Sequence, residues 1–298
     1  MRFTLFIAAA AGLALVFPAT GLAGQALSLF TTAGVALLFF LHGARISREA
    51  LVQGATNLRL HFAILTATFV IFPVLGLLLR PLMAPLVGEA FIPGLLFLCA
   101  LPSTVQSAIA MVSLARGNLA AAVCAASLSS AVGLVVTPAL VGVLLSAQGA
   151  QVTPASVGRL LGSLLLPFVV GHLLRPRLAA ALERRQRMLR WVDQGSIVLL
   201  VYGAFSHAVE ERVFEQVSWT QLAALVGCVA ALLFGALALT RLLSKVLRLP
   251  VEDEIALVFC GSKKGLTSGL PVAHALFPGA AATLVVLPVM LFHQLQLM

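Results

Sequence analysis

Polar residues are rare along this chain, and they separate long apolar runs instead of alternating with apolar residues inside them. A helix needs about 20 apolar residues to cross a bilayer, and the runs reach that length, whereas a membrane β-strand would show alternation. The pattern therefore predicts an all-α polytopic membrane protein. Ten transmembrane helices are expected, over residues 3–20, 25–43, 60–80, 90–115, 118–145, 154–178, 191–209, 218–243, 252–276 and 279–298.

The composition supports a membrane location. Hydrophobic residues make up 61% of the 298 residues and charged residues 10%, whereas roughly a quarter of a soluble domain is charged. The net charge of +9 could suggest a nucleic acid partner, but the basic residues gather at the ends of apolar runs, as from Arg45 to Arg59 and from Arg175 to Arg190. Such clusters mark cytoplasmic loops. We therefore expect an integral protein of the cell (inner) membrane with a cytoplasmic amino terminus, and no nucleic acid partner.

The expected helices divide into two equal sets at about residue 150. Because five is an odd number, the second set must begin on the opposite face of the membrane, so residues 1–150 and 151–298 would form two inverted repeats. One amphipathic segment follows the second expected helix, "ISREALVQGATNLR" (46–59), and another follows the sixth, "LERRQRMLRW" (182–191). Each is expected to lie at the headgroup boundary, with its arginines toward anionic membrane lipid.

Helix-breaking residues interrupt the fourth and ninth expected helices. The stretch "ALPSTVQSAIA" surrounds Pro102, and "GSKKGLTSGLP" contains Gly261, Gly265 and Pro271. Broken backbone survives in a bilayer only where protein buries it or where it lines a cavity, and paired breaks in two repeats indicate a substrate site. For the fourth helix alone, a proline kink with serines bonded to their own helix remains the alternative. The residues expected to line the substrate or ion site are Ser103, Thr104, Gln106, Ser107, Ser262, Lys263, Lys264, Thr267 and Ser268.

The adjacent lysines Lys263 and Lys264 are the least expected residues of the ninth helix. A lysine at the centre of a bilayer costs roughly 2.5 to 3.5 kcal/mol, and no Asp or Glu lies deep in an expected helix. Relief can come from a water-filled cavity, an anionic ligand, the carbonyl ends of the broken helices or loss of the charge. A wet cavity lined by the lysines and open to anions is the most economical interpretation.

The sequence carries no sign of catalysis. HExxH spacing, a GxSxG elbow and a complete P-loop are all missing, and the four cysteines have no metal-like spacing. No catalytic residue, metal site or cofactor is therefore predicted, and the protein is not expected to be an enzyme.

Three stretches carry a resemblance that spans the chain: "FLHGARIS", "LPSTVQSAIAMVSLARGN" and "CGSKKGLTSGLP". They resemble the bile acid:sodium symporter superfamily, in particular its bacterial subgroup related to solute carrier family 10 member 7. The resemblance implies a symporter-like secondary active transporter of a small organic anion that works by alternating access. It further implies a panel domain of helices 1, 2, 6 and 7 and a core domain of helices 3 to 5 and 8 to 10, with helices 4 and 9 crossing where they unwind.

The resemblance also implies a sodium site behind that crossing, but its ligands are not kept. They map onto Ser107 and Ala108, Ala122 and Ala126, Ser262 and Leu266, of which Ser107 remains as an oxygen ligand and no carboxylate is present. Two hypotheses stay open for the coupling ion, Na⁺ or H⁺. Either Lys263 or Lys264 replaces the cation, permanently or by titrating, or sodium binds backbone carbonyls and hydroxyls while the lysines face the substrate. A non-transporting regulator or scaffold is the alternative function, with an intramembrane enzyme a weaker one.

Overall fold

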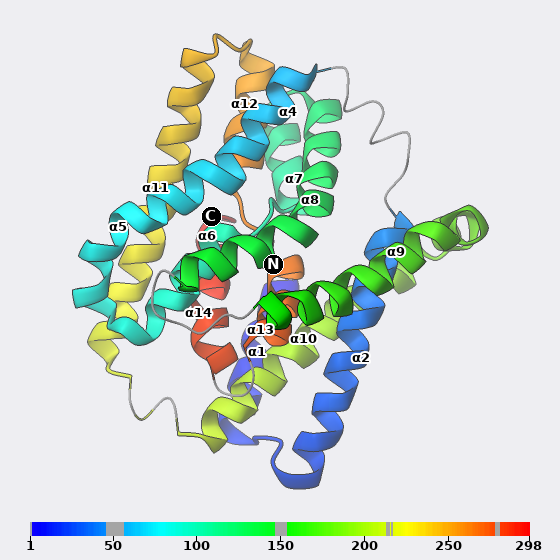
Figure 1. The fold of residues 1–298 in the computed structure, drawn as a ribbon, viewed down its shortest axis with the longest axis vertical. Helices are drawn as coiled ribbons and strands as arrows, with labels where there is room; N and C mark the ends of the chain where they lie inside the picture. Colours follow the sequence, from blue (N-terminus) through cyan, green and yellow to red (C-terminus); the bar gives the residue numbers. More distant parts are fainter. Residues whose placement is uncertain (1, 46–56, 147–153, 213–214, 216, 278–280) are drawn as a thin grey trace. The chain divides into compact units, whose positions relative to one another are not determined.

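The computed structural model describes residues 2–45, 57–146, 154–212, 215, 217–277 and 281–298, and most of these residues are helical (Figure 1). The chain forms two compact units. Unit 1 comprises Met1–Ile46, Thr153–Ser218 and Leu270–Val286, and unit 2 comprises Ser47–Val152, Trp219–Gly269 and Leu287–Met298. Both units are thus built from segments far apart in the sequence.

Unit 1 is built around a tight pair of helices. Its main helices are α1 (Arg2–Val16), α2 (Gly21–Arg45), α9 (Pro154–Arg184) and α10 (Gln186–Glu210), with α1 packed on α10 and α2 on α9. A Cβ atom on Gly43 would lie 2.0 Å from the carbonyl oxygen of Phe168, and one on Gly171 would lie 2.0 Å from that of Phe40. Glycine is therefore required at both places, since small residues let membrane helices approach closely.

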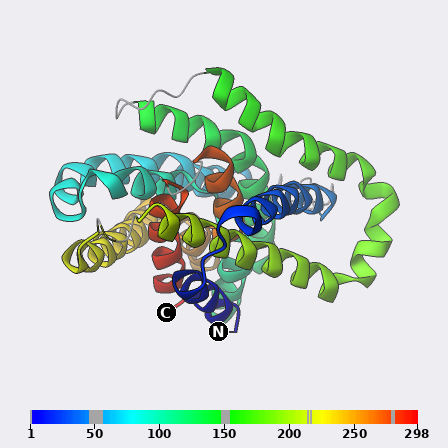
Figure 2. The same ribbon diagram turned by 90° about the horizontal axis from the view of Figure 1, so that it is seen from below.

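The arginine-rich segment 182–191 forms the turn between α9 and α10. The amide of Arg185 donates to the carbonyl of Leu182 at 3.2 Å, and α9 passes almost directly into α10 (Figure 2). The segment thus belongs to the ends of two long helices and is not a separate surface helix. Its expected counterpart at 46–59 lies mostly outside the described residues.

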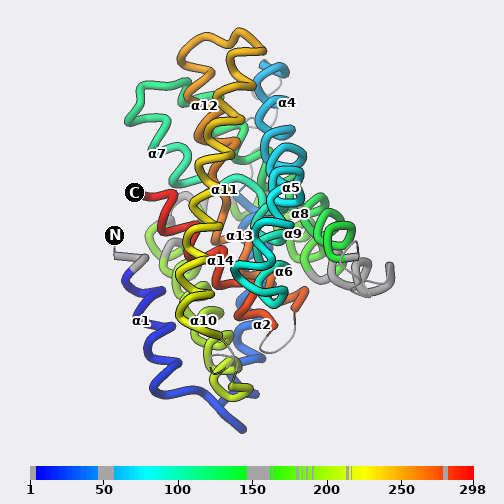
Figure 3. The backbone as a smooth tube through the Cα atoms, turned by 90° about the vertical axis from the view of Figure 1, so that its left-hand side faces the viewer, coloured from blue at the N-terminus to red at the C-terminus, as the bar shows by residue number. Residues whose placement is uncertain are grey.

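Unit 2 holds the interrupted helices. Its first long segment is α4 (Leu58–Thr66), the π-helical turn η2 (Ala67–Ile71) and α5 (Phe72–Val87), and α11 (Trp219–Val246) runs beside α5 and α12 (Figure 3). The remaining elements are η3 (Glu89–Phe91), α6 (Ile92–Ala100), α7 (Gln106–Leu114), α8 (Leu119–Ser146), α12 (Val251–Ser262), the start of α13 (Leu266–Leu276) and the end of α14 (Ala281–Leu295).

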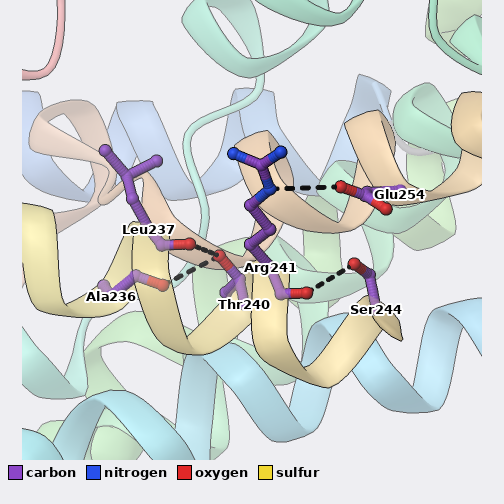
Figure 4. Close-up of polar contacts among 6 residues, drawn as sticks. All are labelled: Ala236, Leu237, Thr240, Arg241, Ser244 and Glu254. Atoms are coloured by element: carbon purple, nitrogen blue, oxygen red, sulfur yellow. Dashed lines mark hydrogen bonds and ion pairs between the residues drawn. The ribbon is translucent and has the colours of Figure 1, made fainter. Parts of the chain in front are cut away.

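The contact between α11 and α12 shows how polar groups are paired inside unit 2 (Figure 4). The buried hydroxyls of Thr240 and Ser244 donate to carbonyls of their own helix, at 2.8 Å to Ala236 and 2.7 Å to Arg241. Arg241 also reaches Glu254 on α12, with 3.7 Å between Nε and Oε1. Because these hydroxyls are paired within α11, they can face α12 without an unpaired donor.

Asp253 joins the amino-terminal ends of α4, α8 and α12. Its two carboxylate oxygens accept hydrogen bonds from the amides of Asn57 at 2.9 Å and Asn118 at 2.8 Å. The same asparagines cap their own helices, by accepting from the amides of Leu60 and Ala121. A carboxylate is favoured here because helix amino termini carry partial positive charge.

The "LARGN" stretch leads into this junction. Arg116 has a φ of 59°, and a Cβ atom on Gly117 would lie 2.5 Å from a side-chain carbon of Ile255 on α12. A larger residue than glycine would therefore push α12 away from the start of α8.

Four helical stretches of the described residues are long and apolar enough to cross a membrane: Gly21–Arg45, Leu58–Val87, Leu119–Leu145 and Trp219–Val246. Large apolar side chains stay on their surfaces, such as Leu22 and Phe234, which are 85% and 68% exposed. Water would not favour such surfaces, but lipid does. The protein is an all-helical polytopic membrane protein.

Candidate functional site

The two interruptions of unit 2 meet each other. α6 ends at Ala100 and α7 begins at Gln106, while α12 ends at Ser262 and α13 begins at Leu266. Between them, Ser103 and Lys264 form an antiparallel bridge, and the amide of Gly265 donates to the carbonyl of Pro102 at 2.9 Å. The unpaired backbone of one break is therefore satisfied in part by the other.

Small residues allow this approach. A Cβ atom on Gly133 of α8 would lie 2.6 Å from the Pro102 ring, and one on Gly269 would lie 2.6 Å from a methyl group of Leu101. Glycine at these two positions thus has a packing role, because any side chain there would collide with the residues of the first break.

The ammonium group of Lys264 lies at the centre of the crossing. Its side chain is 1% exposed, and its Nζ lies 4.2 Å from the centroid of the Phe72 ring. Nζ donates to three backbone carbonyls, those of Thr68 at 2.8 Å, Cys99 at 2.9 Å and Leu101 at 2.7 Å. A lysine ammonium has three N–H donors and no acceptor, so these carbonyls satisfy it completely.

This arrangement differs from the wet cavity expected from the sequence. Of the ways to stabilise a buried lysine, the structure uses backbone carbonyls for Lys264, those of Cys99 and Leu101 at the end of α6 and that of Thr68 in the π-helical turn η2. Lys263 is 4% exposed, donates to the backbone carbonyl of Gln296, and lies with Nζ 5.6 Å from the centroid of the Phe259 ring.

Gln296 is a site residue that the sequence did not indicate. It is 3% exposed, its Oε1 accepts from the backbone amide of Lys264 at 2.9 Å, and its Nε2 donates to the Lys264 carbonyl at 3.0 Å and contacts His293 Nδ1 at 3.0 Å. The extended backbone at Lys264 thus lies opposite Ser103 in the bridge, and its amide and carbonyl are both hydrogen-bonded to the Gln296 side chain. The available signal was an amide within the apolar run of the tenth expected helix.

The nine residues expected to line the site lie at or beside the two breaks, but their exposure differs. Five are buried: Ser103, Thr104, Ser262, Lys263 and Lys264. The hydroxyl of Ser262 donates to its own helix, to the carbonyl of Val258 at 2.6 Å. Gln106 is exposed and Ser107, Thr267 and Ser268 are half-buried, so these four are the residues that a solute could reach.

The positions that the resemblance assigns to sodium ligands are largely apolar here. Ala108 and Ala122 are fully buried in a cluster that includes Val112, Leu257 and Cys260. Methyl groups therefore occupy space where oxygen ligands were implied. Within the described residues, no three His, Cys, Asp or Glu side chains come together as a metal site would need.

Interrupted membrane helices that meet at polar residues are the architecture of a secondary transporter. The sequence matches the model of the SBF-like CPA transporter family over residues 1–298, and the chain belongs to that family. As the family consists of transporters, this protein is a membrane transporter and not an enzyme.

Relatives of this chain include bacterial and animal proteins. An uncharacterised protein of Pseudomonas aeruginosa is 48% identical over 298 residues, which cover 100% of this chain and 90% of that protein. The putative symporter YfeH of Escherichia coli (strain K12) is 44% identical over 99% of this chain and 89% of its own length. Sodium/bile acid cotransporter 7 of Danio rerio is 27% identical over 94% of this chain and 85% of its own length.

Proposed function

We propose that this protein is a secondary active transporter that carries a small organic anion by alternating access. The observation that carries the proposal is the pair of buried lysines at the meeting point of the two breaks. Among the described carboxylates, none forms an ion pair with Lys263 or Lys264. The site therefore has a positive charge that protein carboxylates do not neutralise, and an anion is the solute that such a site favours.

The accessible side chains support the same conclusion. Gln106 and Ser107 begin α7, and Thr267 and Ser268 lie in the first turn of α13. The first amides of a helix have no partner within it and carry partial positive charge. We propose that a carboxylate or similar oxyanion binds at these two helix starts, with the side-chain hydroxyls as further donors.

The topology that goes with this function has ten spans in two inverted repeats, with the amino terminus in the cytoplasm. In that scheme the fourth span is α6 with α7 and the ninth is α12 with α13. Support comes from the five-helix interval between the two breaks and from the arginine-rich turn at α9 and α10. The coupling ion would be Na⁺ or H⁺ if the transporter is a symporter.

Uptake into proteoliposomes tests the proposal. Purified protein is offered a panel of labelled small organic anions, with sodium and proton gradients imposed separately. We expect accumulation of at least one anion, and a loss of about tenfold or more when Thr267→Ala removes a donor from the first turn of α13. Thr32→Ala is the matched control, since Thr32 is an exposed threonine of α2 that donates to its own helix. Uptake that is confined to neutral or cationic solutes contradicts the proposal.

A further inference from the structure

The carbonyls around Lys264 are free because of local features of the chain. At the end of α6, the carbonyl of Leu98 accepts from the amide of Leu101 at 3.3 Å, and the carbonyl of Ala100 accepts from the Thr137 hydroxyl at 2.8 Å. In a continuous α-helix the carbonyl of Cys99 would accept from the amide of Ser103, but that amide donates to the Ser129 hydroxyl at 3.0 Å. The carbonyl of Cys99 is therefore left without a main-chain donor.

The carbonyl of Thr68 is released by a different feature. In the π-helical turn η2, the amide of Phe72 donates to the carbonyl of Ala67, one residue further back than in an α-helix. The next donor in that register would come from residue 73, which is Pro73 and has no N–H. The carbonyl of Thr68, a fully buried residue, is thus left without a main-chain donor and accepts from the ammonium group of Lys264.

We propose that these three carbonyls and the Phe72 ring form a binding site for a monovalent cation, and that Lys264 fills it as a cation attached to the chain. The distances of 2.7 to 2.9 Å are those of charge-assisted hydrogen bonds from an ammonium group. Backbone carbonyls also hold K⁺ in channels, and an aromatic face attracts cations. The ligand class is ammonium, alkylammonium or a small alkali cation.

The geometry requires a charged occupant. A neutral amine would offer two N–H groups, and its lone pair would face the third carbonyl. With the site empty, three carbonyl dipoles would converge in a buried space, next to the negative end of α6. Lys264 supplies the charge that stabilises them and cannot dissociate.

The cation site itself does not depend on the proposed function. The consequence of this site for transport does rest on the proposed function. A cation that stays attached to the chain cannot be taken up with the substrate, so wild-type uptake should not need a free cation at this place. Lys263 is a useful comparison, because it donates to a single described carbonyl and does not occupy a comparable cage.

The direct test removes the lysine and supplies a free cation. Full-length Lys264→Ala protein in nanodiscs is titrated with ammonium, methylammonium, K⁺ or Na⁺ chloride against choline chloride at constant ionic strength, and the melting temperature Tm is read. We expect a lower Tm than wild type in choline and a saturable rise of about 3 °C or more with ammonium or methylammonium. Wild type, Lys263→Ala and the exposed-lysine variant Lys245→Ala should show no cation-selective rise. A Tm of Lys264→Ala that is independent of the cation overturns the proposal.

A second measurement uses the wild-type protein, in case Lys264→Ala does not fold. In ¹⁵N-labelled protein, the Lys264 ammonium should give a protected, slowly exchanging signal that disappears in Lys264→Arg. Rapid exchange of that signal overturns the proposal. Failure to find a transported anion would count against the proposed function, but it would leave both of these readouts unchanged.

Discussion

Gln296 holds the backbone of Lys264 at both polar atoms, accepting from its amide at 2.9 Å and donating to its carbonyl at 3.0 Å. The Gln296 side chain thus supplies the donor and the acceptor that a neighbouring β-strand would supply to an extended residue. It fixes the direction in which the Lys264 side chain leaves the backbone, and thereby aims the ammonium group at the three carbonyls.

Gln296→Leu should destabilise unit 2. It leaves the buried amide and carbonyl of Lys264 without this partner, at a cost of about 1 to 3 kcal/mol for each unsatisfied group. The free energy of unfolding in mixed micelles measures the effect. Gln294→Leu is the control, since Gln294 lies two residues earlier, at the end of α14, and is half-buried. If both variants lose the same free energy of unfolding, the contact between Gln296 and Lys264 does not itself stabilise the protein.

Gly171→Ala should separate α2 from α9 in unit 1. The new Cβ atom would lie 2.0 Å from the backbone oxygen of Phe40, so the helices must move apart, and overpacking of this kind costs about 1 to 3 kcal/mol. Thermal unfolding is the readout. Gly162→Ala on the same helix has no neighbour within 4 Å and should leave stability unchanged or slightly raise it. A stable Gly171→Ala protein would mean that this close approach is not maintained.

Asp253→Asn should weaken the junction of α4, α8 and α12. The substitution removes the negative charge from three helix amino termini and replaces one acceptor oxygen with a donor that faces Asn57 or Asn118. We expect a loss of about 1 to 3 kcal/mol in the free energy of unfolding. Glu252→Gln removes an exposed charge from the same helix turn and serves as the control. The junction is not a stabilising element if both variants unfold at the wild-type denaturant concentration.

Pro73→Ala should disturb the Lys264 site without touching the lysine. The new N–H can pair with the carbonyl of Thr68, which would then compete with the ammonium group for its acceptor. We expect faster exchange of the Lys264 ammonium protons and a fall in uptake of at least a few fold. Pro85→Ala removes an exposed proline from the same helix and should change neither readout. Unchanged exchange in Pro73→Ala would argue that Thr68 is not an essential part of the cage.

Several parts of the site followed from local sequence. Pro102 and the glycines of "CGSKKGLTSG" deprive the backbone of donors or of a helical preference, so the positions of both interruptions could be read directly. The clustering of arginines and the length of apolar runs likewise indicated the membrane character. The sequence could not place Gln296 or Thr68, because they lie 32 and 196 residues from Lys264.

The prediction from sequence and the structure differ most in the environment of the two lysines. The sequence favours a wet cavity because no Asp or Glu lies deep in an expected helix and no other partner for an ammonium group is visible. The structure supplies partners of another kind, the carbonyls of Thr68, Cys99 and Leu101. Every residue carries a carbonyl, so residue type gives no sign of which ones are unpaired and converge.

Apolar length and helix-breaking residues act over a few turns of chain, and for that reason the sequence alone determined an all-helical membrane protein with polar interruptions at residues 101–105 and 263–265. The charge of Lys264 meets carbonyls from two segments that lie far from it in the sequence, Thr68 in η2 and Cys99 and Leu101 at the end of α6. Only the tertiary structure decided that, since a hydrogen bond between distant segments depends on packing and not on local propensity.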